Sequence, residues 1–204
     1  MGDARLGLAT ADRVFPPPEA LDRLVRRTEV SVAAVLVRRA AFFEAGGFRD
    51  RWPYHMDWEL WIKIATRHPV GFLSEVLGYH REHDDRLSDR FGRTPLLTAK
   101  DRLGMLQEAI PQLPLPERRR RELLDAAMRS LAQTQLVDAW DWAVDGDGRR
   151  ARAEARFAFG IDRRVALRAP LLVAAAYAGS FLPSTVLRRV NAGRSALRAI
   201  VRRD

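Results

Sequence analysis

The chain has 204 residues, enough for one domain with an appended segment, and 47% of them are hydrophobic, which is ordinary for a globular protein. It contains no cysteine, which excludes a disulfide framework, a thiolate metal site and a cysteine nucleophile. The formal charge of +9 comes almost wholly from arginine, because Lys63 and Lys100 are the only lysines. This basic excess has two interpretations, a solvated surface or a surface that contacts anionic lipid, nucleotide phosphates or nucleic acid.

The N-terminal part of the chain predicts a helix, a strand and a second helix. Three consecutive prolines from Pro16 end an irregular segment, and residues 19–27 carry leucine and valine at helical spacing. Residues 30–37 form an apolar, β-branched run without alternation, which predicts a central strand covered on both faces. Residues 38–45 predict a short helix that ends at Gly46, where a positive φ is wanted.

A further helix is predicted over residues 56–68, where Trp58 and Trp61 share one face and Pro69 ends the pattern. Asp57 therefore lies in the first turn, where the unpaired backbone N–H groups favour the ionised carboxylate. Taken alone, Asp57 reads as an ordinary helix N-terminal acid. The two tryptophans read as core residues, although flat aromatic rings also suit packing against a sugar.

Two short strands are predicted next, over residues 70–73 and 76–80. Just beyond them, Arg81 and His83 are two positions apart on an extended segment, so both side chains can face one cleft. Guanidinium is well shaped for phosphate oxygens, and imidazole is a good ligand for a divalent ion.

The chain changes character at about residue 90 and shows no further strand pattern. We therefore predict two parts, residues 1–90 and a helical tail over residues 91–204. Helices are predicted in the tail over residues 94–110, 117–144 and 149–159.

The end of the tail carries an apolar stretch, residues 169–182, which is shorter than the ~20 residues that span a bilayer. Arg194, Arg198 and Arg202 follow at four-residue spacing with apolar residues between them. Such a segment fits a membrane interface or a helix packed on the domain with its arginines in water. The first ten residues show no signal-peptide pattern.

In their order and spacing, the pieces from residue 28 to residue 88 resemble the C-terminal half of the catalytic domain of family 2 glycosyltransferases, which have the GT-A fold. The resemblance implies an α/β fold: a partial GT-A (Rossmann-like) domain over residues 1–90, lacking its N-terminal nucleotide-binding half, followed by the α-helical tail. The matching pieces are the strand at 30–37, the turn Gly46-Gly47-Phe48, the helix start Asp57-Trp58-Glu59-Leu60-Trp61, and the segment from Tyr79 through Arg81-Glu82-His83 to Ser88.

The resemblance also implies a mechanism, a single displacement with inversion. Asp57 would be the general base that removes the acceptor proton. The implied substrate contacts are Gly47, Trp58, Trp61 and Arg81. A divalent metal, Mg²⁺ or Mn²⁺, would neutralise the diphosphate leaving group, held by an upstream Asp-x-Asp motif and contacted by His83.

Two departures from the family pattern stand out. Met56 occupies the position before the base, which is commonly acidic in the family. The chain begins after the point where the family's nucleotide-binding half and its Asp-x-Asp motif are expected, so a separately encoded N-terminal half is an expected partner. Residues 145–147 read Asp-Gly-Asp, but they lie at a turn within the helical tail, and we do not interpret them as a metal site.

The expected function is that of a glycosyltransferase fragment in cell-envelope polysaccharide synthesis. It would move a sugar from a nucleotide-sugar donor to a saccharide or lipid-linked acceptor. The expected location is cytoplasmic, peripheral on the inner face of the cell membrane, with an anionic membrane surface as a contact and no nucleic-acid partner. The alternative is a non-catalytic arginine-rich module that binds anionic lipid or nucleic acid, and a third interpretation is a regulatory or scaffolding remnant.

Overall fold

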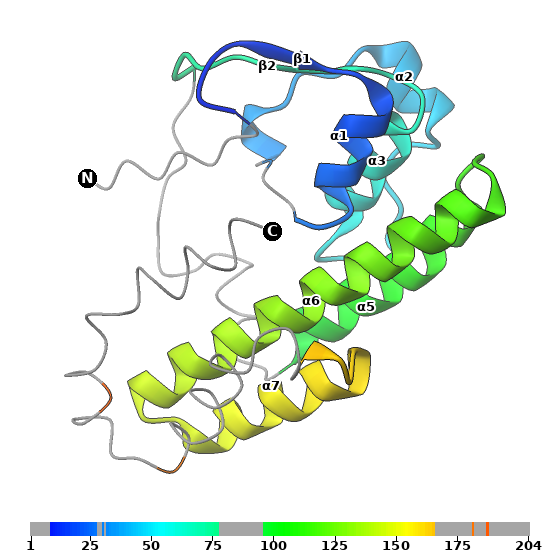
Figure 1. Cartoon of the computed structure of the whole chain (residues 1–204). Helices are drawn as coiled ribbons and strands as arrows, with labels where there is room; N and C mark the ends of the chain where they lie inside the picture. The colour runs from blue at the N-terminus through cyan, green and yellow to red at the C-terminus, as the bar shows by residue number, and fades with distance from the viewer. Residues whose placement is uncertain are drawn as a thin grey trace. The chain divides into compact units, whose positions relative to one another are not determined.

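A computed structural model describes residues 9–27, 30, 32–77, 96–165, 181 and 187. The described part of the protein is mostly helical and includes a small antiparallel sheet of two strands (Figure 1). Its elements, in chain order, are β1 (Arg13–Phe15), α1 (Pro17–Leu24), the 3₁₀ turn η1 (Val32–Ala34), α2 (Arg39–Glu44), α3 (Met56–Ala65), β2 (Val70–Phe72), α5 (Leu97–Ala109), the 3₁₀ turn η2 (Ile110–Gln112), α6 (Glu117–Asp145) and α7 (Gly148–Ile161).

The described residues divide into two compact units. The first unit holds residues 9–77 with Lys100–Ala127, and the second holds residues 96–99 with those from Met128 onward. The first part of the predicted helical tail thus belongs with the N-terminal residues. One contact that links the start of α6 to the N-terminal residues is a hydrogen bond of 2.7 Å, which Arg119 of α6 donates to Asp22 of α1. Local sequence pattern does not reveal such a partner.

The sheet of the first unit is formed by strands that are far apart in the sequence. β1 pairs antiparallel with β2, with Arg13 opposite Phe72 and Phe15 opposite Val70. Phe15 is buried, and Pro17 begins α1 directly after the strand. We predicted β2 but missed β1, because three residues are too few to show the period of a strand. The strand predicted over residues 76–80 is not formed at 76 and 77, and residues 78–80 lie outside the described part.

The helices of the first unit follow the sequence pattern closely. The predicted helices over residues 19–27, 38–45 and 56–68 are confirmed as α1, α2 and α3. Gly46 follows α2 with a φ of 87°, which confirms its role as a helix-ending glycine. α1 and α3 supply much of the buried apolar surface, including Leu21, Leu24, Trp58 and Ile62.

The central strand predicted over residues 30–37 is wrong. Val32–Ala34 forms a single 3₁₀ turn, in which the Val35 N–H donates to the Val32 carbonyl. Val32 and Leu36 are exposed. β-branched residues favour a strand only where neighbouring strands pair with it, and the sheet in the described part contains only β1 and β2. The mixed α and β composition therefore stands, and the described residues do not form the sheet layout of a GT-A domain.

The second unit is built on the later part of α6 and on α7. Alanines of both helices lie in one buried cluster, in which Ala132 and Ala139 of α6 meet Ala155 and Ala158 of α7. The α5, α6 and α7 helices were all predicted, and their bounds lie within a few residues of the prediction. Within the described ranges, no helix has the length and apolar content needed to cross a membrane.

Candidate functional site

Asp57 lies where the sequence predicts it, in the first turn of α3. The turn before the helix is closed by the His55 N–H, which donates to the Trp52 carbonyl at 2.9 Å, and the Glu59 N–H then donates to the His55 carbonyl at 2.8 Å. The Asp57 side chain is half-buried, and its Oδ1 accepts a hydrogen bond from the Trp58 N–H at 2.7 Å. The unpaired N–H groups of the first helical turn interact favourably with negative charge.

Two residues before Asp57, His55 forms a pair with Asp101 of α5. The distance from His55 Nδ1 to Asp101 Oδ2 is 2.8 Å, and the two side chains are 13% and 11% exposed. Burial lowers the pKa of His55, while the hydrogen bond and negative charge of Asp101 act in the opposite direction. The charge of Arg102 lowers this pKa further, and that of Asp57 raises it. A histidine oriented by a carboxylate is a common unit of acid–base sites.

Arg102 ties this part of α5 to α3 and to the segment that follows α1. Its guanidinium donates to the Arg26 carbonyl at 2.6 Å and lies 4.5 Å from the ring centroid of Trp58. These contacts hold the Asp101 backbone close to the start of α3.

The structure places both tryptophans of the predicted substrate site in the core. Trp58 is 1% exposed and Trp61 is 7% exposed. Trp58 Nε1 donates to the Leu24 carbonyl at 2.6 Å, and the Trp61 ring packs edge-to-face against Phe48 at 6.2 Å between centroids. This burial favours the core interpretation over stacking on a sugar, because a ring so enclosed has no open face.

Gly47 also serves the local fold. Its φ of 66° is a conformation that side chains rarely adopt, and a Cβ atom there would meet the Phe42 ring at 3.2 Å. Its N–H donates to the Phe42 carbonyl at 3.0 Å, so this group is already engaged.

Arg81 and His83, the predicted contacts with the diphosphate and the metal, lie outside the described residues. Within the ranges that the structure describes, no group of three histidine or acidic side chains could hold a metal ion. Asp147, part of the Asp-Gly-Asp sequence, caps α7 by accepting a hydrogen bond from the Arg150 N–H at 2.9 Å.

Glu59 is a buried acid that our sequence analysis did not identify. Its side chain is 2% exposed and accepts hydrogen bonds from Arg49 and, at 2.8 Å, from Lys63. Burial alone would raise its pKa, but the bonds and charges of the two cations outweigh burial and lower it. Arg49 also lies 4.0 Å from Glu108 of α5. Glu59 thus faces the interior of the unit, while Asp57 keeps access to solvent.

The residues missed by sequence reasoning are partners at long range. His55 stands directly before the helix start, so its proximity to Asp57 was visible, but Asp101 is 46 positions further along the chain. The one sequence signal for the His55–Asp101 pair is that Asp101 is an acid within a predicted helix, next to Arg102. Local patterns do not specify which residues such a helix faces.

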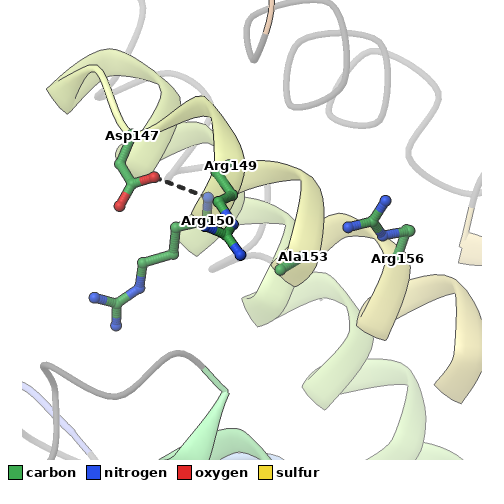
Figure 2. Close-up of a pocket in the computed structure, with 5 residues that line it drawn as sticks. All are labelled: Asp147, Arg149, Arg150, Ala153 and Arg156. Carbon is green, nitrogen blue, oxygen red and sulfur yellow. Dashed lines mark hydrogen bonds between the residues drawn. The ribbon is translucent and has the colours of Figure 1, made fainter.

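The second unit has a basic surface at the start of α7. An open cavity of about 460 Å³ is lined by Asp147, Arg149, Arg150, Ala153 and Arg156 (Figure 2). Figure 2 shows the Asp147 carboxylate bonded to the backbone of Arg150, so the cap and the arginines share this end of the helix. The Arg150 guanidinium lies 3.5 Å from the ring centroid of Trp142.

The second unit also contains a buried carboxyl group, Glu154, which is 4% exposed. Burial raises its pKa to about 7, and the negative charge of Asp138 adds to this effect. The charge of Arg150, whose Nε lies 4.0 Å away, and the Leu96 N–H act in the opposite direction but do not overcome burial. Glu154 is therefore about half protonated near neutral pH.

We expect Glu154→Gln to remove one source of pH-dependent stability. Because the pKa rises from an ordinary 4.5 to about 7 on folding, the folded state binds more protons between these values. The free energy of unfolding of the wild type therefore falls as the pH rises through this window, by at most about 3 kcal/mol, since each pKa unit is worth about 1.4 kcal/mol. Glutamine cannot ionise, so the variant should not lose this stability. Urea denaturation should therefore show that the free energy of unfolding of the variant, relative to that of the wild type, is higher at pH 8 than at pH 5.

The half-exposed Glu122 supplies the control, because Glu122→Gln makes the same chemical change on the surface of α6. A difference between wild type and Glu154→Gln that does not change with pH would contradict the predicted protonation of this carboxyl group.

The chain matches no protein-family model, no curated protein and no solved structure. Fold and site together define a mostly helical protein with a small antiparallel sheet, in which a half-buried acid, Asp57, shares the start of α3 with a His55–Asp101 pair.

Proposed function

We propose that this chain is part of a family 2 glycosyltransferase that transfers a sugar, with inversion, from a nucleotide-sugar donor to a hydroxyl group of a saccharide or lipid-linked acceptor. The observation that carries the proposal is the half-buried carboxylate of Asp57 in the first turn of α3. It stands within the ordered set of motifs from residue 28 to residue 88 that resembles the acceptor side of this family.

Asp57 would act as the general base. Its carboxylate takes the proton of the acceptor hydroxyl as that oxygen attacks the anomeric carbon of the donor sugar. The bond from the anomeric carbon to the diphosphate oxygen breaks in the same step, and the nucleoside diphosphate leaves with the electron pair. Trp58 supports this step indirectly, because its hydrogen bond to the Leu24 carbonyl fixes the first turn of α3 to α1.

The family resemblance implies a divalent ion, which when bound would offset the charge of the leaving diphosphate. The described residues do not provide a set of ligands for it. His83 and Arg81 are proposed as contacts with the metal and the diphosphate.

Exposed apolar side chains near the sheet support the proposal that a nucleotide-binding half completes the domain. Val14, Leu73 and Leu77 are exposed around β1 and β2, and Val32 and Leu36 are exposed beside η1. Exposed apolar side chains that form one patch mark a site of association. We propose that a separately encoded nucleotide-binding half covers them, on the cytoplasmic face of the membrane.

The proposal is tested by Asp57→Asn in the complete enzyme, formed by this chain together with its nucleotide-binding half. We expect the rate of sugar transfer to fall by about 10²-fold or more, because asparagine cannot accept the proton. Binding of the nucleotide-sugar donor, measured by calorimetry, should stay nearly unchanged. Asp50→Asn, a matched change at an exposed turn, should leave the rate at the wild-type level.

Sugar transfer by Asp57→Asn at a rate within a few-fold of the wild type would exclude Asp57 as the base.

A second candidate function, a module that binds anionic lipid, is favoured by the arginine lining of the cavity at the start of α7. On this interpretation, the chain should bind vesicles that contain phosphatidylserine and should lose affinity in Arg149→Gln and Arg156→Gln, while Asp57→Asn has no effect. The two candidate functions are thus separated by their residues: sugar transfer depends on Asp57, and vesicle binding depends on Arg149 and Arg156.

A further inference from the structure

One face of α5 contacts the segment that leads into α3, residues 51–55. The residues of α5 that make these contacts are three and four positions apart, a spacing that places them in one stripe along the helix. The two chains run in opposite directions, and the three contacts are Glu108 with Arg51, Gly104 with the Trp52 ring, and Asp101 with His55. The start of α3 is therefore attached to a helix more than 40 positions further along the chain.

The middle contact brings the Trp52 ring against the backbone of α5. A Cβ atom on Gly104 would lie 2.4 Å from Cη2 and 2.5 Å from Cζ3 of the indole, whereas carbon atoms pack at about 3.5–4.0 Å. Only glycine allows this approach. Among the described residues, Trp52 Nε1 is buried without a hydrogen-bond partner, so packing holds the ring and a bond from its N–H does not.

The first turn of α3 depends on this segment, because His55, which precedes the helix, makes no capping hydrogen bond with its side chain. Its ring is bonded to Asp101 instead, at 2.8 Å. The backbone closes the turn, since the His55 N–H donates to the Trp52 carbonyl at 2.9 Å and the Glu59 N–H donates to the His55 carbonyl at 2.8 Å. A displacement of Trp52 is thus passed directly to the turn that contains Asp57.

The three contacts are not equally strong. Arg51 is 65% exposed, and an ion pair in solvent such as its pair with Glu108 contributes little. His55 and Asp101 are only 13% and 11% exposed, so breaking their bond would leave two nearly buried polar groups unsatisfied. The position of the segment therefore depends mainly on this bond and on the packing of the indole.

We infer that Gly104 and Trp52 are positioning residues that hold Asp57 where it can reach the acceptor hydroxyl group. Because Gly104 has no Cβ atom, the Trp52 ring packs on α5 and keeps residues 51–55 in one place, and the first turn of α3 starts from there. This inference rests on the proposed function. It adds α5, which lies beyond the residues that resemble the glycosyltransferase family, to the elements that form the site.

The attachment can be measured without sugar transfer, by hydrogen exchange of backbone amides followed by NMR in the full chain. We expect Gly104→Ala to speed the exchange of the Glu59 amide by about tenfold or more, because the added methyl group must displace the indole. The exchange is compared with that of the His68 amide, which is bonded to the Ile64 carbonyl at the other end of α3. Global unfolding would speed both amides, whereas the inference requires a local change at Glu59.

Gly160→Ala supplies the control, because Gly160 lies in α7 and a Cβ atom there meets nothing within 4 Å. Alanine is the better helix former at both positions, so helix propensity alone would stabilise both variants. Exchange of the Glu59 amide in Gly104→Ala that matches the wild type would overturn the inference.

A compensating change tests whether the contact itself is responsible. Phenylalanine at position 52 reaches less far than the indole, so Trp52→Phe alone leaves a gap at Gly104 and should also speed the exchange of the Glu59 amide. In Gly104→Ala/Trp52→Phe the methyl group fills that gap, and exchange should be slower than in either single variant. Effects that simply add in the double variant would overturn the inference.

The functional consequence is measured in the complete enzyme, as kcat for each donor-binding site counted by calorimetry. We expect Gly104→Ala to lower this kcat by about tenfold or more, because a small displacement of the base slows the reaction. Trp52→Phe added to Gly104→Ala should restore part of the rate, and Gly160→Ala should keep the wild-type rate. A merely structural role would leave fewer sites, each with the wild-type kcat, and that result would overturn the inference.

The two measurements separate the possible failures. If Asp57→Asn abolishes sugar transfer but Gly104→Ala leaves the exchange of the Glu59 amide unchanged, the inference fails and the proposed function stands. If the exchange changes but the complete wild-type enzyme transfers no sugar, the proposed function fails, and the role of Gly104 in placing a base fails with it.

Discussion

Replacing Trp58 with alanine is expected to lower the free energy of unfolding of the first unit by about 3–5 kcal/mol, the usual cost of removing a buried indole from a core. Trp58 is 1% exposed, donates to the Leu24 carbonyl and packs against the Arg102 guanidinium. Its loss therefore leaves a cavity, an unsatisfied carbonyl and an uncovered cation. Because domains are stable by only about 5–15 kcal/mol, the variant should be partly unfolded at 37 °C. Urea denaturation followed by circular dichroism measures the effect.

The contribution of the indole N–H can be separated from that of the ring by two matched variants, Trp58→Phe and Trp61→Phe. Both tryptophans are buried, but only Trp58 has an Nε1 that bonds to another described residue, since Trp61 Nε1 is buried without such a partner. We expect Trp58→Phe to cost about 1–3 kcal/mol more than Trp61→Phe, because it leaves the Leu24 carbonyl unsatisfied. Equal costs would show that the hydrogen bond from Trp58 contributes nothing to stability.

The success of the sequence in predicting α3 has a clear physical basis. Apolar residues recur at the helical period from Trp58 onward, Pro69 stops the pattern, and the resulting helix places Asp57 in its first turn. Each of these signals lies within the helix itself or next to it. The same holds for α2, which Gly46 ends with a positive φ.

The strand predicted at residues 30–37 failed because a strand depends on neighbours that local sequence does not contain. Residues of this type form a strand when other strands hydrogen-bond to them, and Val32–Ala34 instead forms a local 3₁₀ turn. β1 is the opposite case, a strand that forms without a strand pattern in its sequence. Arg13–Phe15 carries no strand pattern, yet it pairs with β2 because the chain returns alongside it.

The polar contacts of the candidate site were beyond prediction for the same reason. Asp57 was found from its place in a helix, but the bond from His55 to Asp101 crosses 46 positions, and the partner of Glu59, Arg49, lies in a loop. Sequence alone suggests which acids are available. Only the packed structure shows that Glu59 is enclosed with two cations while Asp57 is half-buried at the start of α3.

Arg49→Met is expected to lower the free energy of unfolding by about 1.5–3 kcal/mol at pH 7, the usual range for a hydrogen bond to a charged group, because it leaves the buried carboxylate of Glu59 with Lys63 as its remaining cation. Chemical denaturation measures this cost. The cost should shrink as the pH falls toward 5. In the wild type, Arg49 and Lys63 hold the pKa of Glu59 below its ordinary value, whereas in the variant only Lys63 opposes burial, so protonation of Glu59 becomes easier.

The double variant Arg49→Met/Glu59→Met tests the reason for that cost, because it removes the buried charge together with its partner. Replacing both members of a buried ion pair by apolar side chains is often nearly neutral, and Lys63, whose side chain is 20% exposed, can extend its ammonium group into water. We therefore expect the double variant to be more stable than Arg49→Met alone. The loss in free energy of unfolding in the double variant could instead equal the sum of the losses in Arg49→Met and Glu59→Met. That result would show that the two residues stabilise the fold through packing and not through their charges.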